Sequence, residues 1–354
     1  MSRFHCQCQP ARAPATIAGG IAMVLPFACI LGDAGKTGGD GMAGPRVLVV
    51  AGTHGNEVNA PWLLQQWERS AGLLESHGLD VVPVIGNPEA QRLGRRYVDR
   101  DLNRSFRPEW LEPDASAPRD QEIERARDLL HRYGPGGSEA CVLALDLHST
   151  TAAMGSSLVV YGRRLPDLAL AAALQARLGL PIYLHEGDPA QQGFLVERWP
   201  CGLVIEIGPV PQMVVSARII EQTQLVLQAA LHLIAAAWNG RMLTPERLVV
   251  HRHLGSLDLP RDPQGRADAL IHPELQGRDW SPLRRGDPLF LTAAGDTISY
   301  TGPDGVVPVF INEAAYAEKA IALSVTSKEE WPLSPEAPGA LRDLLIRAQR
   351  GEPL

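Results

Sequence analysis

A histidine and a glutamate stand three residues apart in residues 52–57 (GTHGNE), directly after an apolar run. One turn of chain can point His54 and Glu57 at the same ion, and imidazole nitrogen and carboxylate oxygen both suit zinc. Two protein ligands are too few, because a catalytic zinc site has three protein ligands and a water. His148, in residues 146–151 (DLHSTT), follows a second apolar run. The sequence therefore predicts one zinc ion per chain, held by His54, Glu57 and His148.

Asp146 stands two residues before His148, at the end of the same apolar run. A carboxylate there can accept a hydrogen bond from a ligand imidazole and hold the tautomer that binds metal. It can equally cap the loop that follows the strand. The local sequence favours neither role, so both stay open.

Amide hydrolysis at a metal also needs a group that transfers a proton to the leaving amine. Glu206 lies in residues 204–209 (VIEIGP), among apolar neighbours. Burial raises a carboxyl pKa towards the range that suits a general base. A structural ion pair is the alternative, since a buried charge needs a partner. The local sequence alone leaves these two roles open.

Residues 95–104 (RRYVDRDLNR) form a dense polar run with four arginines. Arginine presents a planar fork that suits bidentate contact with a carboxylate, and an asparagine adds a neutral donor. A polar run of this kind is also typical of a solvated surface turn. The run is a candidate anion-binding segment.

Strand-like and helix-like runs alternate from Pro45 to about residue 240. This alternation predicts an α/β fold with a mixed, mostly parallel sheet flanked by helices. His148 would then lie at the carboxyl edge of the sheet, where α/β proteins place their sites. The predicted strands are residues 46–51, 79–85, 140–147, 182–185 and 203–207, and the predicted helices are residues 61–71, 120–133, 167–178 and 216–238.

The pattern changes after Gly240, where short apolar runs stand among proline, glycine and aspartate turns. These runs, residues 248–250, 289–291, 297–300 and 307–311, are typical of short strands. We therefore expect a first domain of residues 45–240 and a smaller β-rich domain of residues 241–332. Residues 333–354 are rich in proline and glutamate, and we expect a peripheral tail there.

Residues 1–41 allow two interpretations. Arg3 and Arg12, an apolar stretch at residues 15–31 and a glycine-rich run resemble a signal peptide, although the stretch is shorter than a membrane span. Alternatively, translation begins at Met42, directly before the first strand, and the preceding residues are a disordered extension or a mis-assigned start. We favour the second interpretation and expect a cytoplasmic protein with no membrane segment.

The 354 residues are 45% hydrophobic and 21% charged, as is typical of a globular protein. The net charge of -7 argues against a nucleic-acid partner, because phosphate binding needs a cationic surface. A small acidic ligand would have to be captured by local arginines. The five cysteines, an odd number, argue against a secreted disulfide scaffold.

Seven sequence blocks in order give the chain a family resemblance. The blocks are GTHGNE, RRYVDRDLNRSF, DLHSTTAAMG, IEIGPVPQ, IHPELQGRDW, GDPLFL and VPVFINEAAYAEK. From about residue 46 to residue 326 the chain resembles the aspartoacylases of the aspartoacylase/succinylglutamate desuccinylase family, which are distant relatives of zinc carboxypeptidases. The resemblance implies a zinc carboxypeptidase-like catalytic domain with a β-rich domain capping its site.

The resemblance also implies roles for individual residues. Zinc would be held by the predicted triad, and Glu206 would activate the zinc-bound water and then protonate the departing amine. Arg96 would support the oxyanion, Asn103 and Arg104 would hold the α-carboxylate, and Tyr316 would reach the substrate from the capping domain. The implied substrate is a small N-acyl amino acid, with N-acetyl-L-aspartate as the first choice, and a homodimer is expected.

The chain departs from the family pattern before Glu206. Vertebrate N-acetylaspartate hydrolases carry a tyrosine and an arginine there that bind the aspartate side chain. Here Arg198 is the candidate for that arginine, although Phe194 is closer to its expected place. A deacylase for aromatic or apolar N-acyl amino acids is therefore the nearest alternative. A carboxypeptidase and a zinc-binding protein without catalysis are the remaining ones.

Overall fold

Apolar residues fill both faces of the first strand, β1 (Arg46–Ala51), in which the last five residues are fully buried. Side chains alternate along a strand, so Val47 and Val49 pack into one hydrophobic core while Leu48 and Val50 pack into another. A strand buried on both faces is typical of a sheet with helices on each side. The predicted strand at residues 46–51 is therefore confirmed.

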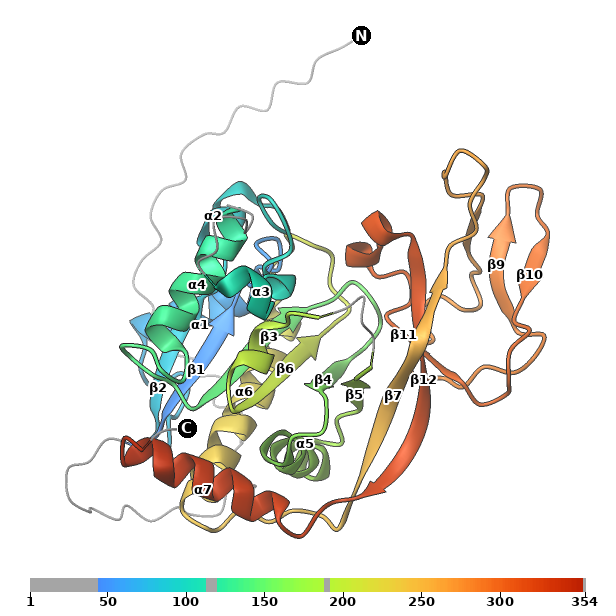
Figure 1. Ribbon diagram of the computed structural model, residues 1–354. Helices are drawn as coiled ribbons and strands as arrows, with labels where there is room; N and C mark the ends of the chain where they lie inside the picture. Colours follow the sequence, from blue (N-terminus) through green and yellow to red (C-terminus); the bar gives the residue numbers. More distant parts are fainter. Residues whose placement is uncertain (1–43, 113–119, 188–191, 353–354) are drawn as a thin grey trace, which may run out of the picture. The chain divides into compact units, whose positions relative to one another are not determined.

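The computed structural model describes residues 44–112, 120–187 and 192–352. The expectations for residues 1–41 lie outside these ranges. Within the described residues, nine strands form one sheet in the order β11-β12-β7-β5-β4-β6-β3-β1-β2 (Figure 1). The other strands of this sheet are β2 (Asp80–Ile85), β3 (Leu143–Ser149), β4 (Ser156–Tyr161), β5 (Ile182–His185), β6 (Cys201–Ile207), β7 (Arg247–Asp258), β11 (Val307–Val309) and β12 (Ile321–Pro332).

The sheet is mixed but mostly parallel. Strands β2, β1, β3 and β6 pair in parallel, and so do β4, β5 and β7. The change of direction falls between β6 and β4, which pair antiparallel. At one edge β7, β12 and β11 also pair antiparallel. This topology confirms the predicted fold class.

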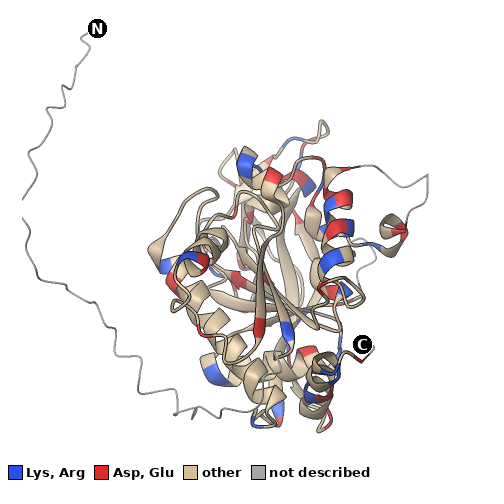
Figure 2. Ribbon diagram, turned by 90° about the vertical axis from the view of Figure 1, so that its left-hand side faces the viewer, with Lys and Arg blue, Asp and Glu red and all other residues tan. Residues whose placement is uncertain are grey.

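Helices cover both faces of the sheet. On one face, α1 (Asn59–Arg69), α5 (Leu165–Leu178), α6 (Ala217–Trp238) and α7 (Ala337–Gln349) contribute to the larger core. On the other face, α4 (Gln121–Tyr133) and two 3₁₀ helices, η1 (Leu102–Arg104) and η2 (Leu195–Arg198), contribute to the second core. The short helices α2 (Pro88–Leu93) and α3 (Pro108–Leu111) lie in the connections. Figure 2 shows the charged residues mainly on helices and loops, whereas the strands are mostly uncharged.

A smaller β-rich unit follows α6, as predicted. Its three-stranded antiparallel sheet has the order β10-β9-β8 and consists of β8 (Ala269–Ile271), β9 (Pro288–Thr292) and β10 (Thr297–Ser299). It has a separate core with Leu275, Phe290 and Ile311. The long strands β7 and β12 connect this unit to the large sheet (Figure 1), so the two parts share strands.

The last segment differs from the peripheral tail that the sequence predicts. Helix α7 packs against α5 and α6, and its side chains Leu341 and Leu345 are fully buried in the larger core. Leu341, Leu344 and Leu345 have the three- and four-residue spacing that places apolar side chains on one helix face. This face, and not the flanking proline and glutamate residues, decides where the segment lies.

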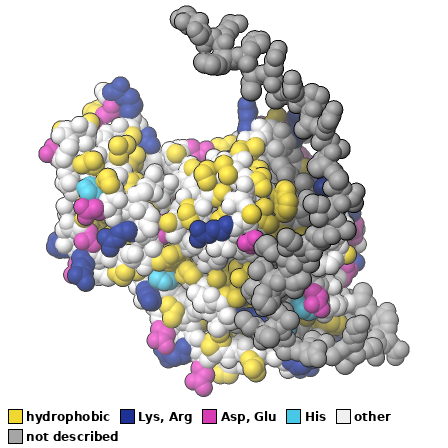
Figure 3. All heavy atoms as spheres, turned by 180° about the vertical axis from the view of Figure 1, so that it is seen from behind, with side chains coloured by type: hydrophobic (Ala, Val, Ile, Leu, Met, Phe, Trp, Pro, Cys, Tyr) yellow, Lys and Arg dark blue, Asp and Glu magenta, His cyan; other side chains and the backbone are white. Residues whose placement is uncertain are grey.

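Two surface features bear on partners. Among the described helices, α6 alone is long and apolar enough to cross a membrane, but 61% of its most apolar window is buried inside the protein, as in a core helix. Trp62, Met213, Val214 and Val215 are exposed, and Figure 3 shows hydrophobic side chains gathered on the face seen from behind. Exposed apolar patches are typical of interaction surfaces. The expected homodimer stays a prediction.

The burial of α7 gives a test of this part of the fold. We expect Leu345→Ala to lower the free energy of unfolding by about 2–5 kcal/mol, because it leaves a cavity in the core. The control is Arg350→Ala at an exposed position near the end of the chain, which should change stability by less than about 0.5 kcal/mol. Urea denaturation of both variants measures the difference. Equal stability of the two variants would show that α7 does not contribute to the core.

Candidate metal centre and active site

The three predicted metal ligands come together at the carboxyl ends of β1 and β3. These strands pair in parallel, with Ala51 opposite Leu147, so the loop after β1 lies beside the end of β3. His54 and Glu57 lie in that loop, and His148 is the next-to-last residue of β3. Each residue offers one ligand atom, and these atoms lie within 4.8 Å of one another. The structure therefore supports the metal site that the sequence predicts.

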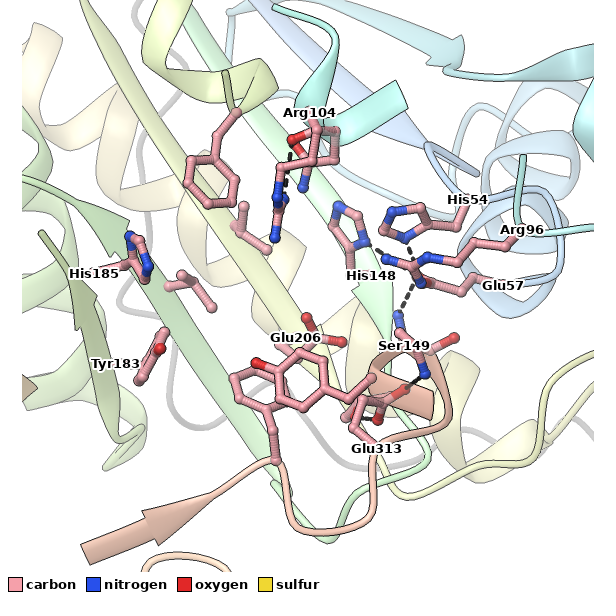
Figure 4. A pocket seen from close by; sticks show the side chains of 18 of the residues that line it. His54, Glu57, Arg96, Arg104, His148, Ser149, Tyr183, His185, Glu206 and Glu313 are labelled. Atoms are coloured by element: carbon pink, nitrogen blue, oxygen red, sulfur yellow. Dashed lines mark hydrogen bonds and ion pairs between the residues drawn. The ribbon is translucent and has the colours of Figure 1, made fainter. Parts of the chain in front are cut away.

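Both imidazoles direct Nδ1 towards the Glu57 carboxylate. His54 Nδ1 lies 2.6 Å from Glu57 Oε1, and His148 Nδ1 lies 3.2 Å from Glu57 Oε2 (Figure 4). The backbone N–H of Ser149 donates to the same Oε2 at 2.8 Å. All three side chains are buried. Two nitrogens and a carboxylate that converge from neighbouring loops are the donor set that zinc uses in catalytic sites.

The second nitrogen of each imidazole contacts another carboxylate. His148 Nε2 lies 2.8 Å from Asp146 Oδ2, and His54 Nε2 lies 3.0 Å from Asp101 Oδ1. Thr53 Oγ1 donates to the other oxygen of Asp146 at 2.7 Å. Carboxylates in these positions would hold Nε2 protonated and leave the Nδ1 lone pair for a bound metal. Of the two roles considered for Asp146, the structure shows contact with the imidazole.

Sequence reasoning did not assign Asp101, although the residue lies inside the polar run of residues 95–104. It also caps η1 by accepting from the backbone N–H of Asn103 at 2.9 Å. Asp101 and His54 are 47 residues apart in the sequence, so their contact could not be predicted from local spacing.

The charges of the buried triad favour a cation. Burial acts to raise the pKa of Glu57, but His54 and His148 outweigh it and hold this pKa far below its usual value. Burial likewise acts to lower the pKa of His148, yet the carboxylates of Asp146 and Glu57 raise it well above its usual value. Three carboxylates, those of Glu57, Asp101 and Asp146, thus contact the two imidazoles. A divalent cation at the triad would balance this negative charge.

Glu206 lies beside His148 on the sheet. Strands β3 and β6 pair in parallel with His148 opposite Glu206, and residues opposite each other in neighbouring strands point to the same face. The Glu206 side chain is 9% exposed and lines the same cavity as the triad. Burial raises its pKa well above the usual value, with Glu57 and Glu313 adding to the shift and His148 and Arg96 opposing it. A carboxyl group of this kind suits proton transfer near neutral pH.

Arg96 reaches the metal end of the cavity. Its Nη1 lies 3.5 Å from Glu57 Oε1, and its Nη2 donates to Asp101 Oδ2 at 3.1 Å. The backbone also joins the two loops, since Gly55 N–H donates to the Arg96 carbonyl at 3.1 Å. The guanidinium therefore stands where it can contact an oxygen that develops negative charge close to the triad.

Asn103 and Arg104 line the same cavity from η1. Asn103 Oδ1 accepts from the backbone N–H of Leu195 at 2.9 Å, so its Nδ2 group is the one that can donate to a ligand. The Arg104 guanidinium stacks over the ring of Phe194 at 4.0 Å, and its Nη1 donates to the Asn103 carbonyl at 3.0 Å. These contacts fix an amide donor and a cation side by side.

The buried residue Glu122 of α4 holds the polar run in place. Its carboxylate accepts from the backbone N–H groups of Val98, Asp99 and Arg100 at 2.6, 3.0 and 3.2 Å. It also accepts from Asn87 Nδ2 at 3.0 Å. Sequence reasoning did not single out Glu122. The feature that could have indicated its burial is its position next to the apolar face of a predicted helix.

The β-rich unit contributes Tyr316, as the resemblance implies, and also Glu313. Both lie at or beside η3 (Ala314–Lys319) and line the cavity. The Tyr316 hydroxyl lies 3.3 Å from Ser324 Oγ. Glu313 Oε2 accepts from the backbone N–H groups of Thr151 and Ala152 at 2.9 and 3.1 Å, in the loop after β3. Glu313 was not predicted, and it joins the β-rich unit to the strand that carries His148.

Arg198 does not line the cavity, contrary to the prediction that it binds the substrate side chain. The residue is exposed and lies in an adjoining surface hollow with Glu186, Gln192 and Glu197, and His185 lines both this hollow and the cavity. The reason is the geometry of η2, in which Leu195 and Val196 are buried while Glu197 and Arg198 face outward. Phe194, at the start of η2, enters the cavity instead.

The end of the cavity away from the triad is mostly aromatic and apolar. Its lining residues are Val159, Tyr161, Tyr183, His185, Phe194, Val204 and Phe310. The rings of Tyr161 and Phe194 stack with their centroids 3.8 Å apart. Two of these residues lie on β4, a strand that was not predicted, so sequence reasoning missed this wall.

Comparison with known proteins places the chain in one family. The succinylglutamate desuccinylase/aspartoacylase catalytic domain matches residues 43–234, and the AstE/AspA barrel-sandwich hybrid domain matches residues 246–328. The chain is 60% identical over 304 residues to a probable aspartoacylase of Prochlorococcus marinus (strain MIT 9313), covering 86% of this chain and 99% of the relative. It is 57% identical to the probable aspartoacylase of Synechococcus sp. (strain CC9605), covering 85% and 98%.

Solved structures agree with this placement. Murine aminoacylase 3 is 36% identical and superposes with a TM-score of 0.74 over 82% of this chain and 97% of its own. Succinylglutamate desuccinylase from Vibrio cholerae, at 18% identity and a TM-score of 0.56 over 81% and 82%, shares the fold. The chain therefore belongs to the succinylglutamate desuccinylase/aspartoacylase family of hydrolases.

Proposed function

We propose that this protein hydrolyses the amide bond of small N-acyl amino acids with zinc held by His54, Glu57 and His148. The observation that carries the proposal is the register of β3 and β6, which sets Glu206 next to His148 on one face of the sheet. A metal-binding protein without catalysis has no need of a carboxyl group with a raised pKa beside its ligands. The names of the relatives, aspartoacylase and aminoacylase, agree with this reaction.

Zinc fits the donor set of two imidazole Nδ1 atoms and one carboxylate, each buried and supported by further hydrogen bonds. When bound, zinc polarises a substrate carbonyl and lowers the pKa of water. The Asp101 and Asp146 carboxylates keep the two imidazoles oriented for this role.

Glu206 moves the proton. As the base it accepts a proton from the attacking water, whose oxygen forms the new bond to the carbonyl carbon. As the acid it then returns the proton to the nitrogen, and the C–N bond breaks to release a carboxylate and a free amino acid. A single carboxyl group serves both steps because burial raises the pKa of Glu206, which makes it a stronger base than an exposed carboxylate.

The arginines and their neighbours orient the substrate. Arg96, at the triad, stabilises the negative charge that develops on the carbonyl oxygen. Arg104 and Asn103 bind the α-carboxylate, with the guanidinium as the cation and the amide as the second donor. Tyr316 donates its hydroxyl from the opposite wall. Fixing both ends of a small substrate contributes to the rate by orientation.

N-acetyl-L-aspartate is the first-choice substrate, and the lining of the cavity favours a second candidate. Arg198 lies outside the cavity, and the wall near Arg104 consists mainly of Tyr161, Tyr183 and Phe194. A wall of this kind suits an apolar or aromatic side chain. N-acyl apolar amino acids are therefore the second substrate class.

Glu313 and η3 close one side of the cavity from the β-rich unit. A closed side argues against a carboxypeptidase, which must admit a long peptide. We further infer a cytoplasmic location and a homodimer. Cell fractionation and light scattering on the purified protein test these two inferences.

The zinc proposal predicts a metal requirement. Purified protein should contain one zinc per chain by elemental analysis, and a chelator should abolish hydrolysis reversibly. His148→Ala should lose the metal, because two ligands leave zinc under-coordinated. The exposed residue His131 gives the matched control, since His131→Ala should keep both metal and activity. Full activity in metal-free protein would rule out this mechanism.

The proton-transfer role of Glu206 has its own test. Glu206→Gln keeps the shape of the side chain but removes the basic oxygen, so we expect kcat to fall by about 10²–10⁴-fold. Zinc content and the unfolding transition should stay unchanged. The control is Glu221→Gln at an exposed position of α6. Assays of N-acetyl-L-aspartate, N-acetyl-L-leucine and N-acetyl-L-phenylalanine follow amine release, and a near wild-type rate for Glu206→Gln would contradict the assignment.

A further inference from the structure

A histidine lies at the end of the cavity that faces away from the metal triad. His185, the last residue of β5, is buried and lines the cavity together with Tyr183. Figure 4 shows His185 and Tyr183 on the side opposite His54 and His148, with the Arg104 guanidinium between the two groups in this view. None of the roles assigned above uses His185.

Sheet register explains this placement. Tyr161 lies opposite His185 in the pairing of β4 and β5, and Val159 lies opposite both Tyr183 on β5 and Val204 on β6. Together with His148 on β3, these side chains share one face of the sheet, which forms the floor of the cavity. His148 and His185 are three strand spacings apart, roughly 14 Å, and the register also offsets them by four residues along the strands, roughly another 13 Å.

Neighbouring rings fix the orientation of His185. Its ring stacks on that of His253 from β7 with centroids 5.0 Å apart, and it meets the ring of Phe194 edge-on at 5.3 Å. The Tyr183 hydroxyl lies 2.9 Å from His253 Nδ1 and holds that second histidine in place. These contacts hold the His185 ring in one orientation, as binding a ligand in a defined geometry requires.

Phe194 connects His185 to the site for the α-carboxylate. The Arg104 guanidinium stacks over the Phe194 ring at 4.0 Å, and the His185 ring contacts the same ring. Two groups that can bind carboxylates therefore lie around one aromatic side chain. The α- and side-chain carboxylates of a single short amino acid are close enough together to contact one group each.

The chemistry of the wall favours a polar occupant at His185. His185 presents a polar ring to a part of the cavity that is lined mainly by aromatic and aliphatic side chains. A leucine or phenylalanine would serve an apolar side chain better. A ring N–H donates well to a carboxylate, and the bond gains strength in a cavity with little water.

We propose that His185 selects the side chain of the substrate by binding the carboxylate of a short acidic amino acid, as in an N-acyl aspartate. This proposal rests on the proposed deacylase function and specifies its substrate class. His185 takes the place of the arginine that was expected at Arg198. His253 and Tyr183 act as positioning residues for it.

The test compares substrates that share one shape. The side chains of N-acetyl-L-aspartate and N-acetyl-L-leucine branch alike, so the charge is the main difference. We expect His185→Phe to lower kcat/KM for the aspartate substrate by about ten- to a hundred-fold, mainly through KM, because a hydrogen bond to a charged group is lost. Turnover of the leucine substrate should stay the same or rise. His185→Gln, which restores an amide donor, should recover part of the loss.

Arg198→Ala is the matched control, because it removes a cation that lies outside the cavity, and it should leave both substrates unaffected. Tyr183→Phe should raise KM for the aspartate substrate, since the support of His253 is lost. Equal losses on both substrates in His185→Phe would overturn the proposal. So would a wild-type preference for N-acetyl-L-leucine.

A binding measurement separates this proposal from the proposed function. In zinc-loaded Glu206→Gln, calorimetry follows the binding of N-acetyl-L-aspartate without turnover. Adding His185→Phe should raise Kd by about ten- to a hundred-fold, and an unchanged Kd would overturn the role of His185. Absence of hydrolysis of every N-acyl amino acid by wild-type enzyme would instead count against the deacylase function. Circular dichroism checks that each variant is folded, and His185→Gln carries the comparison if His185→Phe is not.

Discussion

A buried carboxylate between two imidazoles organises the site. Burial of Glu57 is unfavourable without charged partners, and His54 and His148 supply them from two different segments of chain. Each imidazole in turn needs a partner for its other nitrogen, which Asp101 and Asp146 provide. The network thereby joins the loop after β1, the polar run before η1 and the end of β3. A divalent cation bound at the triad would complete the charge balance of this arrangement.

The second constraint is the register of the sheet. One face of the strands β3, β6, β4 and β5 forms the cavity floor, and each strand contributes a residue at a fixed spacing from the next. His148 and Glu206 lie at the end with the candidate metal site, and His185 lies at the other end, where we propose that the substrate side chain binds. A slip of one residue in any pairing would turn these side chains to the opposite face of the sheet. The same hydrogen bonds that build the core therefore position the chemistry.

Much of the fold could be predicted because its signals are local. The runs at residues 46–51 and 182–185 match β1 and β5, since buried parallel strands are short apolar segments bounded by turns. Strand β4 (Ser156–Tyr161) was missed, because it follows β3 closely and its antiparallel pairing with β6 depends on a distant segment. The tail was misjudged for a related reason. The apolar face of α7 can be recognised as buried only when the positions of α5 and α6, against which it packs, are known.

In the site, residue type and local spacing identified the candidate metal ligands and the buried glutamate beside them. His54, Glu57, His148 and Glu206 stand in short motifs at strand ends, and ligand chemistry restricts such residues to few roles. Tertiary structure decided which carboxylates support them and which residues face the substrate side chain. Arg198 was a candidate for binding the substrate side chain because of its position in the sequence before Glu206. In the structure it is exposed, because the 3₁₀ helix η2 buries Leu195 and Val196 instead. Contacts between strands far apart in the chain, such as the pairing of His185 with His253, depend on packing that no local pattern records.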